Sequence, residues 1–151
     1  MELSAGTILI SSHLMDDDYF KNTILFIAEY NENGAIGFVI NKMNERRINE
    51  LIEFNKSPAF PLFNGGPVDT QHLYFIHRNP DLILDGTKII ENIYFGGDFT
   101  QAINCINNKL INESDIKIFI GYCGWDKGEL ENEITEGFWV IKNDNPEIIF
   151  K

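Results

Sequence analysis

The stretch from Thr23 to Asn41 constrains the fold more than any other part of the chain. Residues Thr23 to Tyr30 combine β-branched and aromatic side chains, which favour a strand. The turn Asn31-Glu32-Asn33-Gly34 follows, and an Asn-Gly pair favours positive φ and a tight hairpin. Ala35 to Asn41 is strand-like again. The sequence therefore predicts a β-hairpin and, with it, antiparallel pairing in the sheet.

Other short apolar runs predict further strands along the chain. They lie at Thr7–Ile10, His72–His77, Lys88–Phe95 (one or two strands), Ile116–Tyr122, Phe138–Ile141 and Glu147–Phe150. Strands and helices alternate without a regular βαβ order. This order predicts an α+β fold with a mainly antiparallel sheet.

Polar residues at capping spacing mark two helix starts. Asp98 is followed three residues later by Gln101, which predicts a helix over Phe99–Leu110. Asp126 and Glu129 repeat this spacing, and the helix that follows is expected to end near position 136. The carboxylates at that second start suit the positive end of a helix dipole and oppose an anionic ligand.

Three other segments have weaker signals. Ile48, Leu51 and Ile52 have helical spacing and predict a short amphipathic helix. His13–Asp18 is polar and acidic, as in a loop or a single helical turn. Ser57–Val68 holds three of the five prolines and predicts an irregular connection.

Size and charge narrow the functional classes. A chain of 151 residues with 44% hydrophobic residues predicts one domain over residues 1–151. The net charge of −11 disfavours nonspecific binding to nucleic acid or to an anionic membrane surface. The basic cluster of Lys42, Arg46 and Arg47 is flanked by glutamates, so a solvated helix face is the expectation for it.

The sequence carries no metal or cofactor motif. The run Asp16-Asp17-Asp18 lacks EF-hand spacing, and the five-residue separation of His72 and His77 places them on opposite faces of a strand. No Walker loop, dinucleotide fingerprint or serine-hydrolase elbow is present. We therefore expect a protein that uses no cofactor or metal. No secretory signal, membrane helix or disulfide framework is visible, so we expect the protein to be cytoplasmic.

Three glycine-containing turns suggest a binding cleft. They contain the pairs Gly34 and Gly37, Gly65 and Gly66, and Gly121 and Gly124, and glycine lets backbone approach a ligand closely. We expect one shared cleft bordered by Asn41, Gly65, Gly66, Pro67, Trp125 and Glu129. Core packing is the alternative role for Trp125, and tight turns are the alternative for each glycine pair.

Several of these segments, taken in order, resemble the YqgE/AlgH family. The matching segments are Gly6–Ile10, Asp16–Ile24, Gly34–Asn41, Gly65–Val68, Gly121–Trp125, Gly128–Ile134 and Trp139. They span nearly the whole chain, and together they are highly specific. The resemblance implies a compact α+β fold with a barrel-like β core flanked by helices, in a bacterial cytosolic protein. It implies no catalytic residue.

The chain departs from the usual family pattern at three positions. Cys123 stands where alanine is common, Asp126 where glycine is common and Glu129 where glutamine is common. The two carboxylates make the turn more acidic than in typical relatives. A cationic or neutral partner therefore suits this turn better than an anionic one.

Three classes of function remain open. We favour a non-enzymatic regulatory or binding module that recognises a protein or small ligand through the cleft. The first alternative is a hydrolase-like or other small-molecule enzyme that uses Glu129, Asp126 or Cys123 as acid, base or nucleophile. The second is a transcriptional regulator, as some family members are labelled, and the net charge opposes direct DNA binding by this chain.

Overall fold

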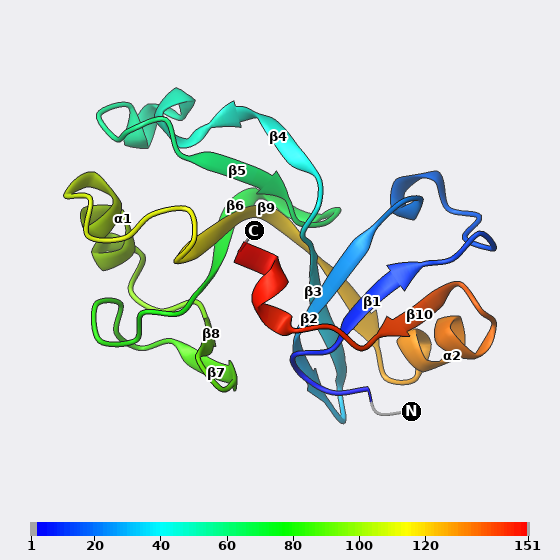
Figure 1. Cartoon of the computed structure of the whole chain (residues 1–151). Coiled ribbons are helices and arrows are strands. Elements are labelled where there is room, and N and C mark those ends of the chain that lie inside the picture. Colours follow the sequence, from blue (N-terminus) through cyan, green and yellow to red (C-terminus); the bar gives the residue numbers. More distant parts are fainter. Residues whose placement is uncertain (1–2, 151) are drawn as a thin grey trace.

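Strand β9 (Ile116–Asp126) runs through the middle of the molecule and is shared by two groups of strands (Figure 1). The computed structural model describes residues 3–150. The first half of β9 pairs in parallel with β5 (Pro61–Asn64) and antiparallel with β6 (Val68–His77). The second half pairs antiparallel with β3 (Gly34–Val39). One long strand thus joins both halves of the fold.

The strands form a ten-stranded sheet in the order β10-β1-β2-β3-β9-β6-β8-β7, with β4 beside β5 off this path. The strands not yet located are β1 (Ile8–Ser11), β2 (Ile24–Asn31), β4 (Met43–Arg47), β7 (Thr87–Ile90), β8 (Ile93–Phe95) and β10 (Trp139–Lys142). Within residues 3–150 the end strands β10 and β7 do not pair with each other, so the sheet does not close. The predicted α+β class is confirmed, and "barrel-like" describes the core only loosely.

The hairpin predicted between residues 23 and 41 is confirmed. Strands β2 and β3 pair with Asn31 opposite Gly34, which leaves Glu32 and Asn33 as a two-residue loop. The side-chain oxygen of Asn31 accepts a hydrogen bond from the backbone N–H of Asn33 at 2.8 Å. The positive φ falls on Gly34, at 136°, where a Cβ would lie 2.0 Å from the Trp125 carbonyl oxygen. A residue with a side chain does not fit at position 34.

Gly121 lets β9 serve both groups of strands. Its φ of 71° breaks the extended conformation in the middle of the strand. A Cβ at this position would lie 2.4 Å from the carbonyl oxygen of Gly66. The backbone of β9 and the turn before β6 are therefore in direct contact here.

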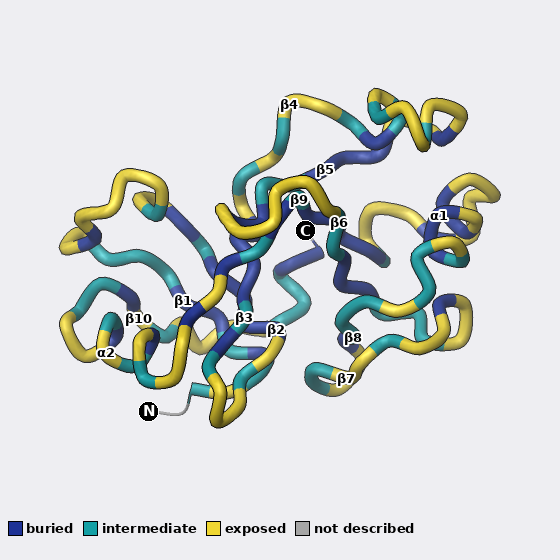
Figure 2. Tube along the Cα trace, turned by 180° about the vertical axis from the view of Figure 1, so that it is seen from behind, coloured by how far each residue is buried: buried dark blue, intermediate teal, exposed yellow. Residues whose placement is uncertain are grey.

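Three groups of buried side chains make up the core. One lies around α1 (Phe99–Asn107), another surrounds Trp139, and the third lies between them, where Phe38 and Phe119 stack with ring centres 4.6 Å apart. Figure 2 shows buried backbone along the central strands and exposed backbone at the loops. Each large, fully buried side chain contributes roughly 1.5–3 kcal/mol through the hydrophobic effect.

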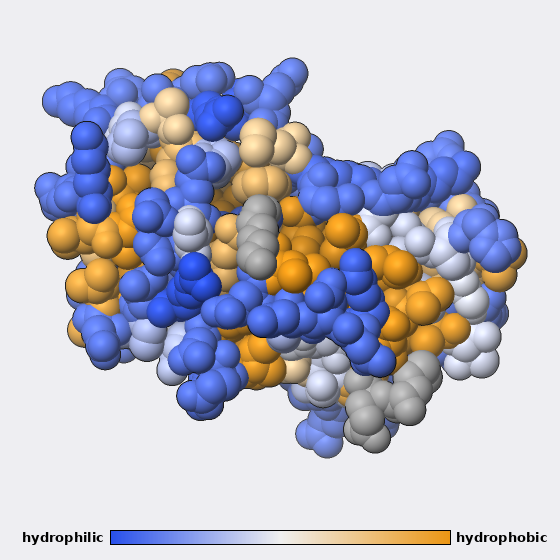
Figure 3. Space-filling view, viewed as in Figure 1, coloured by the Kyte–Doolittle hydropathy of each residue, from blue (hydrophilic) through white to orange (hydrophobic). Residues whose placement is uncertain are grey.

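The face shown in Figure 3 also carries apolar side chains at its surface. One group of them lies over strands β1 and β10, and another lies on the opposite side of the molecule, near α1. Within the described part of the chain, strand β10 pairs with β1 alone, and Val140 on β10 is exposed. This side of the sheet is therefore an edge.

The helix predicted after Asp98 is confirmed. The Asp98 side chain accepts a hydrogen bond from the Gln101 backbone N–H at 3.1 Å. The Gln101 side chain accepts from the Leu84 backbone N–H at 2.8 Å and so does not close a capping box. The helix ends at Asn107, before the predicted Leu110.

Among the described residues no helix is long and apolar enough to span a bilayer.

The amphipathic helix predicted around Ile48, Leu51 and Ile52 is wrong. Two 3-10 turns, η2 (Ile48–Glu50) and η3 (Ile52–Phe54), are separated by Leu51 in an extended conformation. Ile48 is buried, and its backbone N–H donates to the Phe60 carbonyl at 2.8 Å. Ile52 is 86% exposed. Tertiary pairing with the segment before β5 therefore overrides the local spacing.

Two further predictions are corrected. The segment Ser57–Val68 is not wholly irregular, because it contains β5, an inner strand between β4 and β9. Glu147–Phe150 is not a strand and lies in the 3-10 helix η4 (Pro146–Phe150). Ile149 and Phe150 are nevertheless buried in the central part of the core, so the apolar run is used without forming a strand.

Candidate functional site

A pocket of about 380 Å³ lies between the loop after β1 and the turn that leads into α2 (Glu129–Thr135). Three of the six residues predicted to share a cleft, Pro67, Trp125 and Glu129, line it. We call it the Trp125 pocket. The other lining residues are Met15, Asp16, Asp17, Phe20, Val68, Cys123, Gly124, Glu133 and Phe138.

The other three predicted residues lie near this pocket without lining it. Gly66 lines an adjoining pocket of about 480 Å³ on the other side of Pro67. Gly65 is buried, and its carbonyl oxygen accepts from the Cys123 thiol at 3.3 Å. Asn41 lines neither of the two pockets, and its side chain accepts from the Ile24 backbone N–H at 3.0 Å.

The turn before α2 differs from the prediction. Asp126 is the last residue of β9, and the helix N-cap is Gly128, which is left-handed with φ of 85°. The Glu129 side chain accepts from the Asp126 backbone N–H at 2.6 Å. Asp126 is therefore wrong as an N-cap, while Glu129 reaches back to the preceding turn as in the second half of a capping box.

Glu133 connects the two tryptophans of the chain. One of its oxygens, Oε1, accepts from Trp125 Nε1 at 3.2 Å and from Trp139 Nε1 at 2.9 Å. Both indole rings are at most 9% exposed. The carboxylate fixes the indole that forms one wall of the pocket, because a buried N–H needs an acceptor.

This contact gives a stability prediction. Glu133→Leu leaves two buried indole N–H groups without their acceptor, so we expect the free energy of unfolding to fall by about 2–4 kcal/mol. Glu133→Gln keeps an accepting oxygen and is expected to cost about 1 kcal/mol. Urea unfolding followed by tryptophan fluorescence measures both. Equal losses for the two variants would show that the indoles do not depend on this acceptor.

The lining of the Trp125 pocket combines negative charge with apolar surface. Asp16 and Asp17 come from the loop after β1, and Glu129 and Glu133 come from α2. The remaining wall includes the aromatic side chains of Phe20, Trp125 and Phe138 and the apolar side chains of Met15, Pro67 and Val68. Carboxylates beside aromatic faces favour an organic cation, since both attract positive charge.

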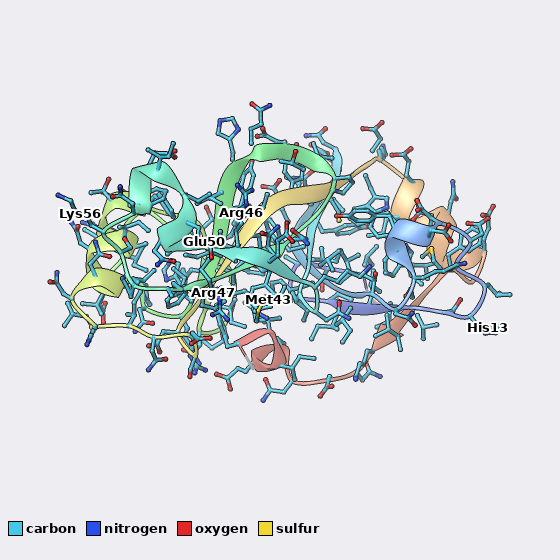
Figure 4. The ribbon with its side chains drawn as sticks, turned by 90° about the horizontal axis from the view of Figure 1, so that it is seen from above. His13, Met43, Arg46, Arg47, Glu50 and Lys56 are labelled. Carbon is cyan, nitrogen blue, oxygen red and sulfur yellow. The ribbon has the colours of Figure 1, made fainter. Side chains whose placement is uncertain are left out.

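The adjoining pocket has the opposite charge, and we call it the Lys42 pocket. Lys42 Nζ donates to the Tyr19 carbonyl at 2.6 Å and lies 5.5 Å from the centre of the Tyr19 ring. Partial burial lowers the pKa of Lys42. Arg46 also lines this pocket, on the opposite side of β4 from Met43 and Arg47 (Figure 4). The sequence prediction of a solvated helix face for this basic cluster is therefore wrong.

Cys123 borders the Trp125 pocket as a buried thiol. Burial raises its pKa to about 12. The charge of Lys42 lowers this pKa, but by less than burial raises it. Among residues 3–150 no histidine is hydrogen-bonded to it, since His77 bonds to Gly96 and Asn79 and His72 bonds to Asp69. The thiolate needed for nucleophilic attack is therefore scarce at neutral pH. No group of three or more metal-ligating side chains is found in the described part of the chain.

Comparison with known proteins gives a consistent result. A family model described as AlgH-like matches residues 8–151. The chain is 36% identical to a UPF0301 protein of Chlorobaculum parvum over 148 residues, which cover 98% of this chain and 79% of that protein. It is also 36% identical to a UPF0301 protein of Parabacteroides distasonis over 140 residues, covering 91% and 71% of the two chains.

Solved structures agree with the fold. The solution structure of the AlgH protein from Pseudomonas aeruginosa superposes with a TM-score of 0.79 at 27% identity, covering all of this chain and 85% of that one. A crystal structure of a Corynebacterium diphtheriae protein gives a TM-score of 0.76 at 18% identity, covering 97% and 78%. The second likeness bears on the fold alone.

Proposed function

This chain belongs to the AlgH-like family, and we propose that it is a non-enzymatic regulatory or binding module that holds a cationic, partly apolar group in the Trp125 pocket. The group is a basic side chain of a partner protein or an organic cation. The observation that carries the proposal is the lining of the pocket, which includes four carboxylates together with aromatic side chains such as Trp125.

The size and charge of the pocket suit this type of ligand. A volume of about 380 Å³ lies within the roughly 300–1,000 Å³ typical of small-ligand sites. Glu129 is exposed at the pocket, so its charge is available to a ligand, while Glu133 holds the Trp125 ring in place. The basic Lys42 pocket next to it favours a ligand or peptide that also carries a negative group.

A regulatory role through a partner protein fits the charge of the chain better than direct DNA binding does. The chain has 23 acidic residues against 12 basic ones. Binding to nucleic acid depends mainly on neutralisation of phosphates by lysine and arginine. An enzymatic role for Cys123 is disfavoured because burial keeps this side chain in the thiol form.

Ligand-induced thermal stabilisation tests the proposal. Agmatine and benzyltrimethylammonium are expected to raise the melting temperature, and benzoate at the same concentrations is not. A ligand at a hundredfold excess over its Kd stabilises the folded state by about 2.7 kcal/mol. For a chain of this length that corresponds to a rise of roughly 5–10 °C.

Glu129→Gln is the diagnostic variant. Its amide oxygen can still accept from the Asp126 backbone N–H, so the turn is kept while the charge is lost. We expect agmatine to bind about tenfold more weakly by calorimetry, which is the loss of one exposed charge contact of about 1.4 kcal/mol. Glu136→Gln, at the opposite end of α2 and outside the pocket, is the control. Equal binding by both variants, or equal stabilisation by benzoate, contradicts the proposal.

A further inference from the structure

Lys117 is a buried lysine at the wall of a third pocket, away from the two described above. It lies on β9, is 6% exposed and borders a cavity of about 240 Å³. We call this cavity the Lys117 pocket. Its other lining residues are Met43, Phe60, Pro61, Phe63, Glu113, Ser114, Ile116 and Phe150. Figure 4 shows Met43 on the side of β4 that faces the C-terminal segment.

Two contacts hold the amine of Lys117 in place. Its Nζ donates to the Ile40 carbonyl oxygen at 3.0 Å and lies 4.0 Å from the centre of the Phe63 ring. The amine is therefore held between Ile40, which directly follows β3, and Phe63 on β5. Lys117 is thus held in one geometry at the wall of the cavity, beside the ring of Phe63, which also lines it.

The amine has no acidic partner among the described residues. No ion pair there includes Lys117. The charged groups nearby are Glu113 at the edge of the pocket, Arg47 on β4, and Asp115 and Glu147, which both pair with Arg78. An unpaired ammonium in such a place is costly, because burial removes its water without supplying a counter-charge.

We propose that Lys117 is a reactive amine that captures small, largely apolar aldehydes as imines in the Lys117 pocket. Burial lowers the pKa of this amine to about 8, so a sizeable fraction is neutral near physiological pH. A neutral amine in an apolar pocket is the form that attacks carbonyl compounds.

The reaction balances without an oxidant or a reductant. The lone pair of neutral Nζ attacks the carbonyl carbon, the π bond of the carbonyl breaks, and a proton passes from the nitrogen to the oxygen to give a carbinolamine. Loss of one water then forms the C=N bond of the imine. Addition of water reverses both steps and returns the amine and the aldehyde, so capture is reversible.

The pocket sets the class of aldehyde. Its volume of about 240 Å³ is below the roughly 300–1,000 Å³ of sites for drug-sized ligands, so only a fragment-sized compound fits. Phe60, Phe63 and Phe150 give it an aromatic lining. Benzaldehyde, which is small, flat and uncharged, is therefore a suitable probe.

Reductive trapping tests the proposal. The protein is incubated with benzaldehyde and cyanoborohydride at pH 7.5, digested, and mapped by mass spectrometry. We expect Lys117 to be labelled at least about tenfold faster than the other eight lysines, because a lysine side chain in water is almost wholly protonated at this pH. The rate at which its amine adds benzaldehyde, measured before reduction, is expected to rise with pH to a plateau with a midpoint near pH 8.

Two controls separate this outcome from its alternatives. Lys117→Arg keeps a positive charge but forms no imine, and it should lose the fast adduct, whereas Lys56→Arg, at an exposed position, should keep it. Benzoate has the same ring without a reactive carbonyl. Thermal stabilisation of the protein by benzoate, together with no fast benzaldehyde adduct at Lys117, would overturn the proposal in favour of an anion site. Adducts spread evenly over the exposed lysines would overturn it as well.

Discussion

Gly66→Ala is expected to lower the free energy of unfolding by at least about 3 kcal/mol, a loss of roughly 6–12 °C in melting temperature. A Cβ at this position would lie 2.1 Å from the Tyr122 carbonyl carbon, 2.2 Å from its oxygen and 2.5 Å from the Cys123 nitrogen. All three atoms belong to the backbone of β9. They cannot move aside as the end of a flexible side chain would.

The turn around Gly66 is also unable to shift as a unit. The backbone N–H of Gly65 donates to the Ile120 carbonyl, and the Gly65 carbonyl accepts from the Val39 N–H, both at 2.9 Å. Relief of the clash would break these bonds, each of which contributes about 1 kcal/mol. The cost is steric and does not depend on φ, because Gly66 is not among the residues with positive φ.

Gly124→Ala is the matched control for this variant. Gly124 also lies on β9 and lacks a positive φ, and its added Cβ would meet only Tyr122 Cε2, at an ordinary distance of 3.4 Å. We expect a change within about 1 kcal/mol, because an alanine in an open strand position is tolerated. Urea unfolding of both variants measures the difference. A Gly66→Ala protein as stable as the Gly124→Ala protein would contradict the close approach of these backbones.

Local patterns in the sequence were sufficient to predict the hairpin and the helix after Asp98. In both cases the residues that decide the structure are neighbours in the chain, such as Asn31 with Asn33 and Asp98 with Gln101. Strand β5 has no such local signal. It begins at a proline and pairs in parallel with β9, with Leu62 opposite Ile118. Its strand conformation depends on a partner more than fifty residues away.

The same distinction holds for the candidate site. The sequence pointed to Trp125 and Glu129, because both lie in one glycine-rich turn. It missed Phe20 and Phe138, which line the same pocket from two other segments. These segments meet because β1 pairs with β10, and that register is not visible in either segment alone. A short apolar run in both strands was the available signal, and it indicates a strand without identifying the partner strand.

Lys117 was missed for a related reason. In the sequence it is a single charge within an apolar strand, which an alternating strand places on a solvated face. The C-terminal segment covers that face instead, with Phe150 at the wall of the Lys117 pocket.

Lys117→Met is expected to stabilise the protein at pH 7, by about 1–2 kcal/mol. Methionine has a similar length and removes a charge that is buried without an acidic partner, and such replacements are often stabilising. The loss of the hydrogen bond to the Ile40 carbonyl, which costs about 1 kcal/mol, limits the gain. Lys56→Met, at an exposed position, is expected to leave stability nearly unchanged and serves as the control.

The gain from Lys117→Met is expected to disappear as the pH rises. The pKa of Lys117 is lowered by burial from 10.5 to about 8, so between these values the unfolded chain carries a proton that the folded chain has released. The stability of the unmodified protein therefore rises with pH in this interval, by up to about 3 kcal/mol from this group. Below pH 8 the full penalty of the buried charge is present, and above pH 10.5 it is absent.

Other groups titrate in the same range, so the difference between the two proteins is the quantity to measure. Burial raises the pKa of Cys123 from 9.0 to about 12, which lowers stability above pH 9 in both proteins alike. Urea unfolding at pH 7, 8.5 and 10 should show the advantage of the Lys117→Met protein shrinking at each step. An advantage that stays constant over these three pH values would mean that the amine of Lys117 keeps its proton in the folded state. The neutral, nucleophilic amine that we infer would then not be present.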